Sequence, residues 1–161
     1  MMERINEQID SVMRKAFYDL LEEKVASKPP DYEWLVRLYK EMRDRLCHLL
    51  KESSHLRTEI TDSMDIVLFE QMLKADAFRY DDFYKLMQYV FCKCKQLGSP
   101  ARDSETDAKL KEITDFINTG NATFGTIVPM FIKNANFCID RIYEDIKTFK
   151  EKLVPVNNSF H

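Results

Sequence analysis

The side chains that most often carry out chemistry in proteins are few in this sequence and widely separated. The chain has four cysteines and three histidines, which are Cys47, Cys92, Cys94, Cys138, His48, His55 and His161. Each cysteine lies within a helical pattern, and a helix would place the side chains of Cys92 and Cys94 about 200° apart, too far apart to share a metal ion. None of the histidines forms a zinc-binding pattern with these thiols. We therefore expect structural cysteines in a reducing compartment, no metal site and no cofactor.

The short motifs that mark common enzyme active sites are missing from the sequence. It has no glycine-rich phosphate-binding loop, no H-E-x-x-H and no serine, histidine and aspartate in a recognised context. The pair Asp81-Asp82 could ligate a divalent ion, but capping of a helix explains the same two residues with fewer assumptions. The sequence therefore predicts a protein that is not an enzyme.

A polar turn at residues 92–105 is the strongest candidate site. It contains Gly98, one of only three glycines, and Pro100, one of five prolines. Gly98 can take the left-handed conformation that closes a helix, and Pro100 cannot continue one. Asp103 or Ser104 can then cap a new helix. The segment predicts a tight corner between two helices.

The corner offers Pro100, Arg102, Asp103 and Glu105 as candidate partner-binding residues. A structural interpretation competes with this one. Asp103 would then satisfy free amide groups at the start of the helix, and Arg102 would bridge to a neighbouring carboxylate. The residue types favour the structural interpretation and leave the binding role open.

Apolar residues recur every three or four positions along most of the chain, which predicts an all-α domain of about six helices. The expected helices are residues 3–26, 32–51, 55–76, 81–96, 104–116 and 123–152, in a domain of residues 1–153 followed by a tail at 154–161. Asp31 should cap the second helix, and Ser63 and Asp65 allow a break in the third. Residues 118–121 read as a turn, and Pro129 must lie in the first turn of the last helix or kink it.

Length and composition set further limits. A chain of 161 residues with 45% hydrophobic and 32% charged residues is typical of one folded domain. The net charge of −3 provides no basic surface for nucleic acid. No apolar run approaches the roughly 20 residues of a membrane span, and the start lacks the apolar core of a signal peptide. The sequence predicts a cytoplasmic protein whose two longest helices, the first and the last, run along a core formed by the second to fourth.

Four segments of this chain carry a resemblance to a known family. They are Lys40-Glu41-Met42-Arg43-Asp44-Arg45-Leu46, Leu56-Arg57-Thr58-Glu59-Ile60-Thr61, Leu97-Gly98-Ser99-Pro100-Ala101-Arg102-Asp103-Ser104-Glu105 and Ala135-Asn136-Phe137. In order and spacing, from about Asp31 to Phe149, they resemble the T-complex protein 11 family. Gly98-Ser99 stands where the family has cysteine and alanine, and the family's second helical half has no counterpart here. The first helix lies outside the resemblance and could either dock a signalling partner or pack on its own domain.

The resemblance implies an all-helical, non-enzymatic regulator that binds other proteins. Members of the family are associated with cyclic-AMP and protein kinase A signalling, and in animals with sperm function. The missing second half suggests a reduced, stand-alone version of the family, for which an origin in a large DNA virus is one interpretation. The oligomeric state stays open.

Two other functions compete with this expectation. Residues 120–128 loosely resemble the asparagine–tryptophan–glycine–arginine segment of Bcl-2-like proteins, which bind an amphipathic helix in a groove. Phe124 stands here for the tryptophan, and Thr126 replaces the arginine. A self-assembling structural protein is the other alternative.

Overall fold

The computed structural model of the chain describes the backbone of residues 2–27 and 31–158, and the side chains of residues 12–13, 15–27 and 31–153. Seven α-helices and one short 3-10 helix account for nearly all of this part, and it contains no strand. They are α1 (Met2–Ala26), α2 (Glu33–Cys47), α3 (His55–Ser63), α4 (Ile66–Lys74), α5 (Tyr80–Leu97), η1 (Pro100–Arg102), α6 (Asp103–Asn118) and α7 (Phe124–Asn158). The predicted all-α class is confirmed.

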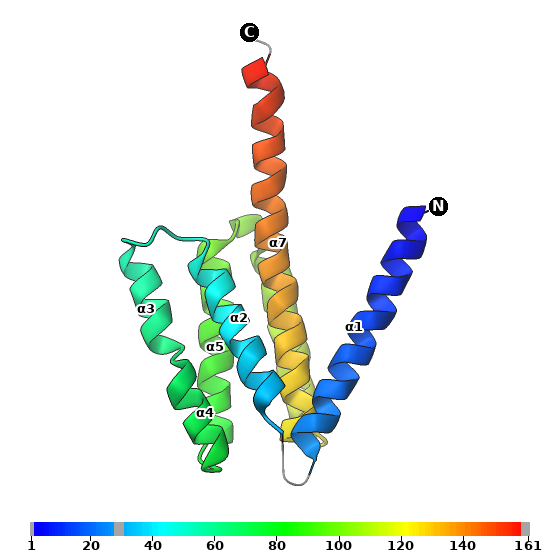
Figure 1. Ribbon diagram of the computed structural model, residues 1–161, viewed down its shortest axis with the longest axis vertical. Coiled ribbons are helices and arrows are strands. Elements are labelled where there is room, and N and C mark those ends of the chain that lie inside the picture. Colours follow the sequence, from blue (N-terminus) through cyan, green and yellow to red (C-terminus); the bar gives the residue numbers. More distant parts are fainter. Residues whose placement is uncertain (1, 28–30, 159–161) are drawn as a thin grey trace.

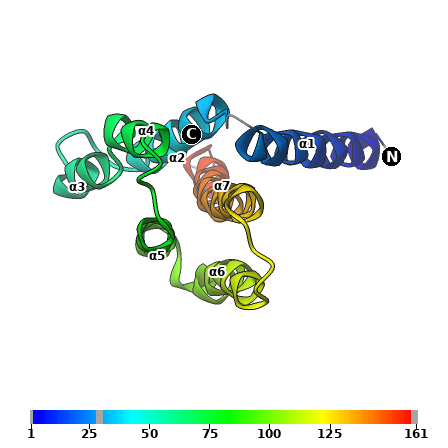
Figure 2. The same ribbon diagram turned by 90° about the horizontal axis from the view of Figure 1, so that it is seen from below.

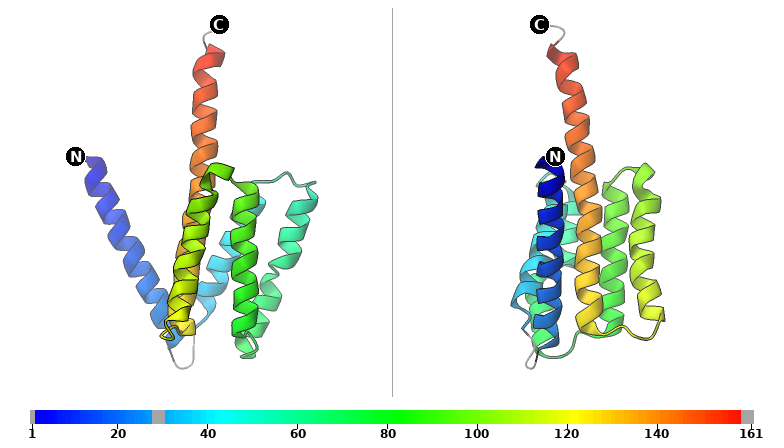
Figure 3. Two further views of the ribbon diagram at one scale, coloured as in Figure 1. Left: turned by 180° about the vertical axis from the view of Figure 1, so that it is seen from behind. Right: turned by 90° about the vertical axis from the view of Figure 1, so that its right-hand side faces the viewer.

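The long helix α7 is the element against which the others pack. It contacts α1, α2, α5 and α6, and the view along the helices in Figure 2 shows these four around it. Its inner face is a stripe of buried apolar residues at helical spacing, which are Ile127, Val128, Phe131, Ile132, Ala135, Cys138, Ile139 and Ile142. Burial of that stripe, rather than helix propensity alone, stabilises so long a helix. The C-terminal end of α7 projects past its neighbours (Figures 1 and 3).

Helix α1 packs on the rest of the domain only through its C-terminal part. Leu21 and Val25 are buried, whereas Val12 and Met13 are 68% and 64% exposed. Figure 1 shows α1 diverging from α7 towards the N-terminus. The expectation that the first helix runs along the core is therefore correct for its last turns only.

The expected third helix is broken into α3 and α4, so the helices exceed the expected six. The break falls at Met64 and Asp65, next to the position that the sequence suggested. The Asp65 carboxylate accepts a hydrogen bond from the Leu68 amide (3.0 Å) and so caps α4, while Met64 is buried in the core. The break lets α4 turn its Phe69 ring onto Tyr39 of α2, with ring centroids 4.1 Å apart.

Local signals at the helix ends are largely confirmed. The Asp31 carboxylate accepts a hydrogen bond from the Glu33 amide (3.1 Å) at the start of α2, and Asp82 accepts one from the Arg79 amide (3.0 Å) at the start of α5. Gly120 has a φ of +80°, as a turn at residues 118–121 requires. Pro129 lies in the second turn of α7. Of the expected tail at 154–161, residues 154–158 continue α7 and residues 159–161 lie outside the described residues.

None of the helices in the described part of the chain is long and apolar enough to cross a membrane.

Candidate functional site

Gly98 ends α5, but not in the left-handed conformation that the sequence suggested. Its φ and ψ are −95° and −178°, an extended backbone that any residue can adopt. A close approach explains the glycine instead. A Cβ atom at this position would lie 2.9 Å from the Cys94 carbonyl oxygen and 3.2 Å from the Cγ1 atom of Ile142 on α7. The corner is therefore pressed directly against α7.

The prediction that Asp103 or Ser104 caps the helix after the corner is wrong. Ser99 is the capping residue, since its Oγ atom accepts a hydrogen bond from the Ala101 amide (3.3 Å) and Pro100 begins η1. Helix α6 follows η1 without an extended residue between them, because Arg102 already has helical angles. A capping side chain needs an extended backbone at its own position, which Asp103 does not have. One Asp103 carboxylate oxygen is buried and has no hydrogen bond in the structure.

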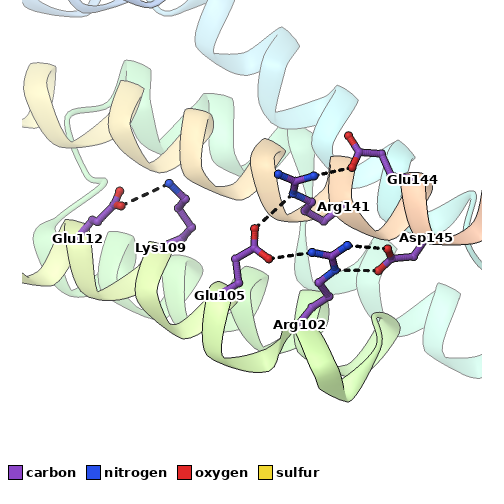
Figure 4. A network of polar contacts seen from close by, with 7 residues as sticks. All are labelled: Arg102, Glu105, Lys109, Glu112, Arg141, Glu144 and Asp145. Carbon is purple, nitrogen blue, oxygen red and sulfur yellow. Dashed lines mark hydrogen bonds and ion pairs between the residues drawn. The ribbon is translucent and has the colours of Figure 1, made fainter.

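Arg102 joins the corner to α7. Its Nε and Nη2 atoms donate to the two carboxylate oxygens of Asp145 (3.1 and 2.9 Å), and its Nη1 atom donates to Glu105 (3.1 Å). Figure 4 shows this two-pronged contact. The hydrogen bonds from Arg102 hold the pKa of the Asp145 carboxyl below its ordinary value, and the two carboxylates raise the pKa of Arg102. The expected bridge from Arg102 to a carboxylate is confirmed.

The contact extends along α6 and α7. The second Glu105 oxygen lies 3.3 Å from Nε of Arg141, and Arg141 Nη1 donates to Glu144 (2.7 Å). We call Arg102, Glu105, Arg141, Glu144 and Asp145 the corner network (Figure 4). Its two cations and three carboxylates pair with one another, and this supports the structural interpretation of the corner. Whether Pro100, Arg102, Asp103 and Glu105 also bind a partner stays a prediction.

The α7 half of this network could not be predicted from the sequence. Asp145 is 43 positions from Arg102, and on α7 alone Glu144 and Asp145 look like part of a solvated polar face. The sequence indicates that Arg102 pairs with a carboxylate, but it contains several acidic residues that could be this partner. Only the packing of α6 on α7 selects Asp145.

A second set of contacts ties α2 to α7. Arg45 Nη1 donates to the Asn136 side chain (3.1 Å), and Arg45 also pairs with Asp140. The Tyr143 hydroxyl donates to the Arg45 carbonyl oxygen (2.6 Å), and the Arg45 guanidinium lies 5.2 Å from the centre of the Tyr143 ring. Residues 40–46 and 135–137, two of the segments that carry the family resemblance, thus meet through Arg45 and Asn136.

A third contact involves a buried lysine of α5. Lys93 is only 8% exposed. Its Nζ atom lies 2.8 Å from the Glu59 carboxylate of α3 and 3.0 Å from the Gln96 side-chain oxygen. Glu59 belongs to a third resembling segment, at residues 56–61. Lys93 thus resembles Arg45 and Arg102. Each is a cation that links one helix to another.

Cysteines and acidic residues are the side chains that could react or hold a metal ion. Cys47, Cys94 and Cys138 are buried and Cys92 is exposed, all four as free thiols. Burial raises the pKa of the Cys138 thiol to about 11, which disfavours the reactive thiolate. Among the side chains that the structure describes, no group of three or more His, Cys, Asp or Glu residues could hold a metal ion.

The Asp145 contact predicts a specific pH dependence. Asp145→Asn is expected to lower the free energy of unfolding at pH 7 by about 1 kcal/mol or less, because solvent screens a pair whose side chains are 39% and 35% exposed. A lowered pKa in the folded state stabilises the fold above the ordinary pKa of an aspartate, and this contribution disappears as the pH falls through the folded-state value.

The difference between wild type and Asp145→Asn should therefore vanish in strong acid. Urea denaturation at neutral and at strongly acidic pH measures it. Asp115→Asn, which removes an exposed pair within α6, is the control. A difference that persists unchanged in acid would show that Asp145 does not act through its charge.

Comparison with known proteins supplies the family. Residues 2–144 match the family model described as T-complex protein 11. The match includes α1. The resemblance found in the sequence begins at about Asp31 and so does not include this helix. No solved structure matches the chain.

Several curated relatives are similar to the chain. The human T-complex protein 11 homolog is 29% identical over 136 residues, which cover 84% of this chain and 26% of the human protein. Mouse T-complex protein 11 is 26% identical over 141 residues (87% and 24%), and the human T-complex protein 11-like X-linked protein 1 is 33% identical over 104 residues (64% and 20%). The chain spans about a quarter or less of the length of these relatives. By the family match over residues 2–144, the chain belongs to the T-complex protein 11 family.

Proposed function

We propose that this chain is a non-catalytic protein-interaction domain that regulates signalling in the cytoplasm, with components of the protein kinase A pathway as its partners. The observation that carries the proposal is the exposed apolar surface of α1. Val12, Met13 and Leu20 are 68%, 64% and 39% exposed on a helix that diverges from the bundle (Figures 1 and 2). Grouped exposed apolar residues are typical of protein-binding surfaces.

The base of α1 is held firmly enough to present that surface. The Phe17 ring stacks on the Trp34 ring of α2 with centroids 5.4 Å apart, and the Lys24 Nζ atom lies 4.8 Å from the centre of the Trp34 ring. Leu21 and Val25 are buried below them. A partner that packs on Val12 and Met13 would therefore meet a helix anchored at one end, which lowers the entropy cost of binding.

The assignment of protein kinase A components rests on the family alone. Relatives in this family are about four times as long as the part matched here or longer, so their partners come to this chain only as a proposal. The corner network fits a structural role, since its charged groups pair with one another.

The proposal is tested by affinity pull-down of the tagged chain from a cytosolic lysate, with quantitative mass spectrometry. We expect the wild type to enrich protein kinase A subunits or their anchoring proteins, and Val12→Ser/Met13→Ser to lose them by about tenfold or more. An Arg102→Ala/Asp103→Ala variant, checked for folding by circular dichroism, tests whether the corner contributes to binding of these proteins. Failure of the wild type to enrich any of these proteins above the tag alone would contradict the proposal.

The Bcl-2-like alternative has no particular observation in its favour. The residues on which it depends act locally: Thr123 and Thr126 exchange hydrogen bonds that cap α7, and the Phe124 ring contacts the rings of Tyr32 and Phe78. Recovery of pro-apoptotic helices in the same pull-down would revive it.

A further inference from the structure

The short helix α4 is apolar on more sides than its own domain covers. Six of its nine residues are large and apolar, which are Ile66, Val67, Leu68, Phe69, Met72 and Leu73. Phe69 and Leu73 are buried against the core, whereas Leu68 is 52% exposed. A helix that is apolar on most of its circumference is usually covered on most of it. The uncovered side of α4 is therefore a surface that lacks its partner.

A groove with a volume of about 340 Å³ lies along this uncovered side, between α4 and α5. Its apolar lining includes Leu68 and Met72 of α4, Leu86 of α5 and Phe78, which lies between these helices. Asp62, Asp65 and Asp82 also line it, together with a single cation, Lys85. We call this feature the acidic groove.

The carboxylates of the acidic groove differ from those that make the contacts between helices. Glu59, Glu105 and Asp145 each pair with an arginine or lysine of another helix or of the corner. In the described residues, none of the three groove aspartates forms an ion pair. Asp65 and Asp82 accept backbone hydrogen bonds at helix starts, and no side-chain cation neutralises either of them in the described residues. Three aspartates and one lysine give the groove a charge of −2, which attracts a cationic partner.

A segment with the complementary properties lies in the same chain, at the projecting end of α7. Ile146, Phe149 and Leu153 are spaced as one stripe of a helix and are 38%, 64% and 46% exposed. Lys147, Lys150 and Lys152 border this stripe, with Glu151 as the one acidic residue among them. Glu144 and Asp145, just before it, are occupied by Arg141 and Arg102. Residues 146–153, which we call the α7 tip, therefore carry a charge of +2.

We propose that the α7 tip of one copy of this chain docks into the acidic groove of a second copy. The apolar stripe of the tip packs against Leu68 and Met72, and its lysines face the groove aspartates. The two surfaces match in kind: an apolar ridge with positive borders meets an apolar groove with a negative rim. Helix α4 is about 14 Å long, which fits the two turns of the tip. The tip projects away from the bundle, so its surface is open to a neighbour (Figure 3).

The proposal goes beyond the interaction with signalling partners, and it is tested on the purified chain alone. Sedimentation equilibrium over a range of concentrations is expected to give an average mass that rises above 19.1 kDa. Phe149→Ser should weaken this association by about tenfold or more. Val67→Ser is the matched control, because Val67 is equally exposed (66%) and does not line the groove. It should leave the association unchanged.

A charge exchange tests whether the two surfaces meet each other. Asp62→Lys and Lys150→Asp should each abolish self-association, since the first removes the net charge of the groove and the second that of the tip. An equimolar mixture of the two variants should associate, because the unchanged tip of Asp62→Lys then meets the unchanged groove of Lys150→Asp. Glu52→Lys, which makes the same charge change in an exposed loop, should associate like the wild type.

Three results would overturn the proposal. The wild type self-associates by this account, so a constant mass of 19.1 kDa up to roughly 1 mM would contradict it. A mixture of Asp62→Lys and Lys150→Asp that stays monomeric would show that groove and tip do not meet. Equal weakening by Val67→Ser and Phe149→Ser would indicate non-specific apolar association instead.

Discussion

Replacement of Phe131 by alanine is expected to destabilise the protein by about 3–5 kcal/mol. Phe131 is 2% exposed on the inner face of α7. Its ring lies 5.5 Å from the Phe83 ring and 6.2 Å from the Phe91 ring, so one side chain of α7 packs with two aromatic residues of α5. Removal of the ring leaves a cavity between the two helices. Because a domain of this kind is stable by only about 5–15 kcal/mol, the loss should leave it close to unfolding.

Urea denaturation followed by circular dichroism measures this effect. Phe131→Leu, which keeps most of the volume, should cost less than about 1.5 kcal/mol. Phe149→Ala is a second control on the same helix, where the phenylalanine is 64% exposed and the change should stay within about 0.5 kcal/mol. Equal destabilisation by Phe131→Ala and Phe149→Ala would mean that the inner face of α7 does not form the core described here.

Gly98→Ala is expected to destabilise the protein by about 1–3 kcal/mol, through overpacking rather than backbone strain. The added methyl group would lie 2.9 Å from a backbone oxygen of α5 and 3.2 Å from Ile142 of α7. The carbonyl group cannot move without disturbing the last turn of α5, so α7 or the corner must shift. The effect should extend to the Arg102–Asp145 contact beside it.

The sign of the Gly98→Ala effect separates this explanation from the usual one. In open space, alanine in place of glycine stabilises by about 0.4–1 kcal/mol, because it restricts the unfolded chain. A stabilised Gly98→Ala variant would therefore contradict the close approach of α7. A double-mutant cycle with Ile142→Ala measures how much of the cost comes from the α7 side chain, and we expect Gly98→Ala to be less harmful in that background.

Both substitutions act on α7, and the same helix links the resembling segments of the family. Arg45 and Asn136 join residues 40–46 to residues 135–137, and Arg102 joins the corner to Asp145. The segments that are furthest apart in the chain thus meet on one helix. The segments that carry the family resemblance thus hold the bundle together. The proposed partner surfaces, on α1, α4 and the α7 tip, lie largely outside these segments.

The sequence by itself determined the helices, because the periodicity that marks a helix depends on neighbours three or four positions away. From local chemistry alone it predicted the all-α class and the turn at Gly120, and it allowed the break before Asp65. It also identified Arg102 as a residue in need of a carboxylate. Each of these features depends on a few consecutive residues, so a single sequence contains the information.

Only the tertiary structure decided which side chains meet between helices. It selected Asp145 for Arg102, buried Lys93 against Glu59 and assigned the cap of the corner to Ser99 instead of Asp103. It also explained why residue 98 is a glycine, because Ile142 lies too close for a larger side chain. The physical cause is the same in every case. A helix fixes which of its residues share a face, but the face that a second helix meets is set by how all the apolar stripes pack at once.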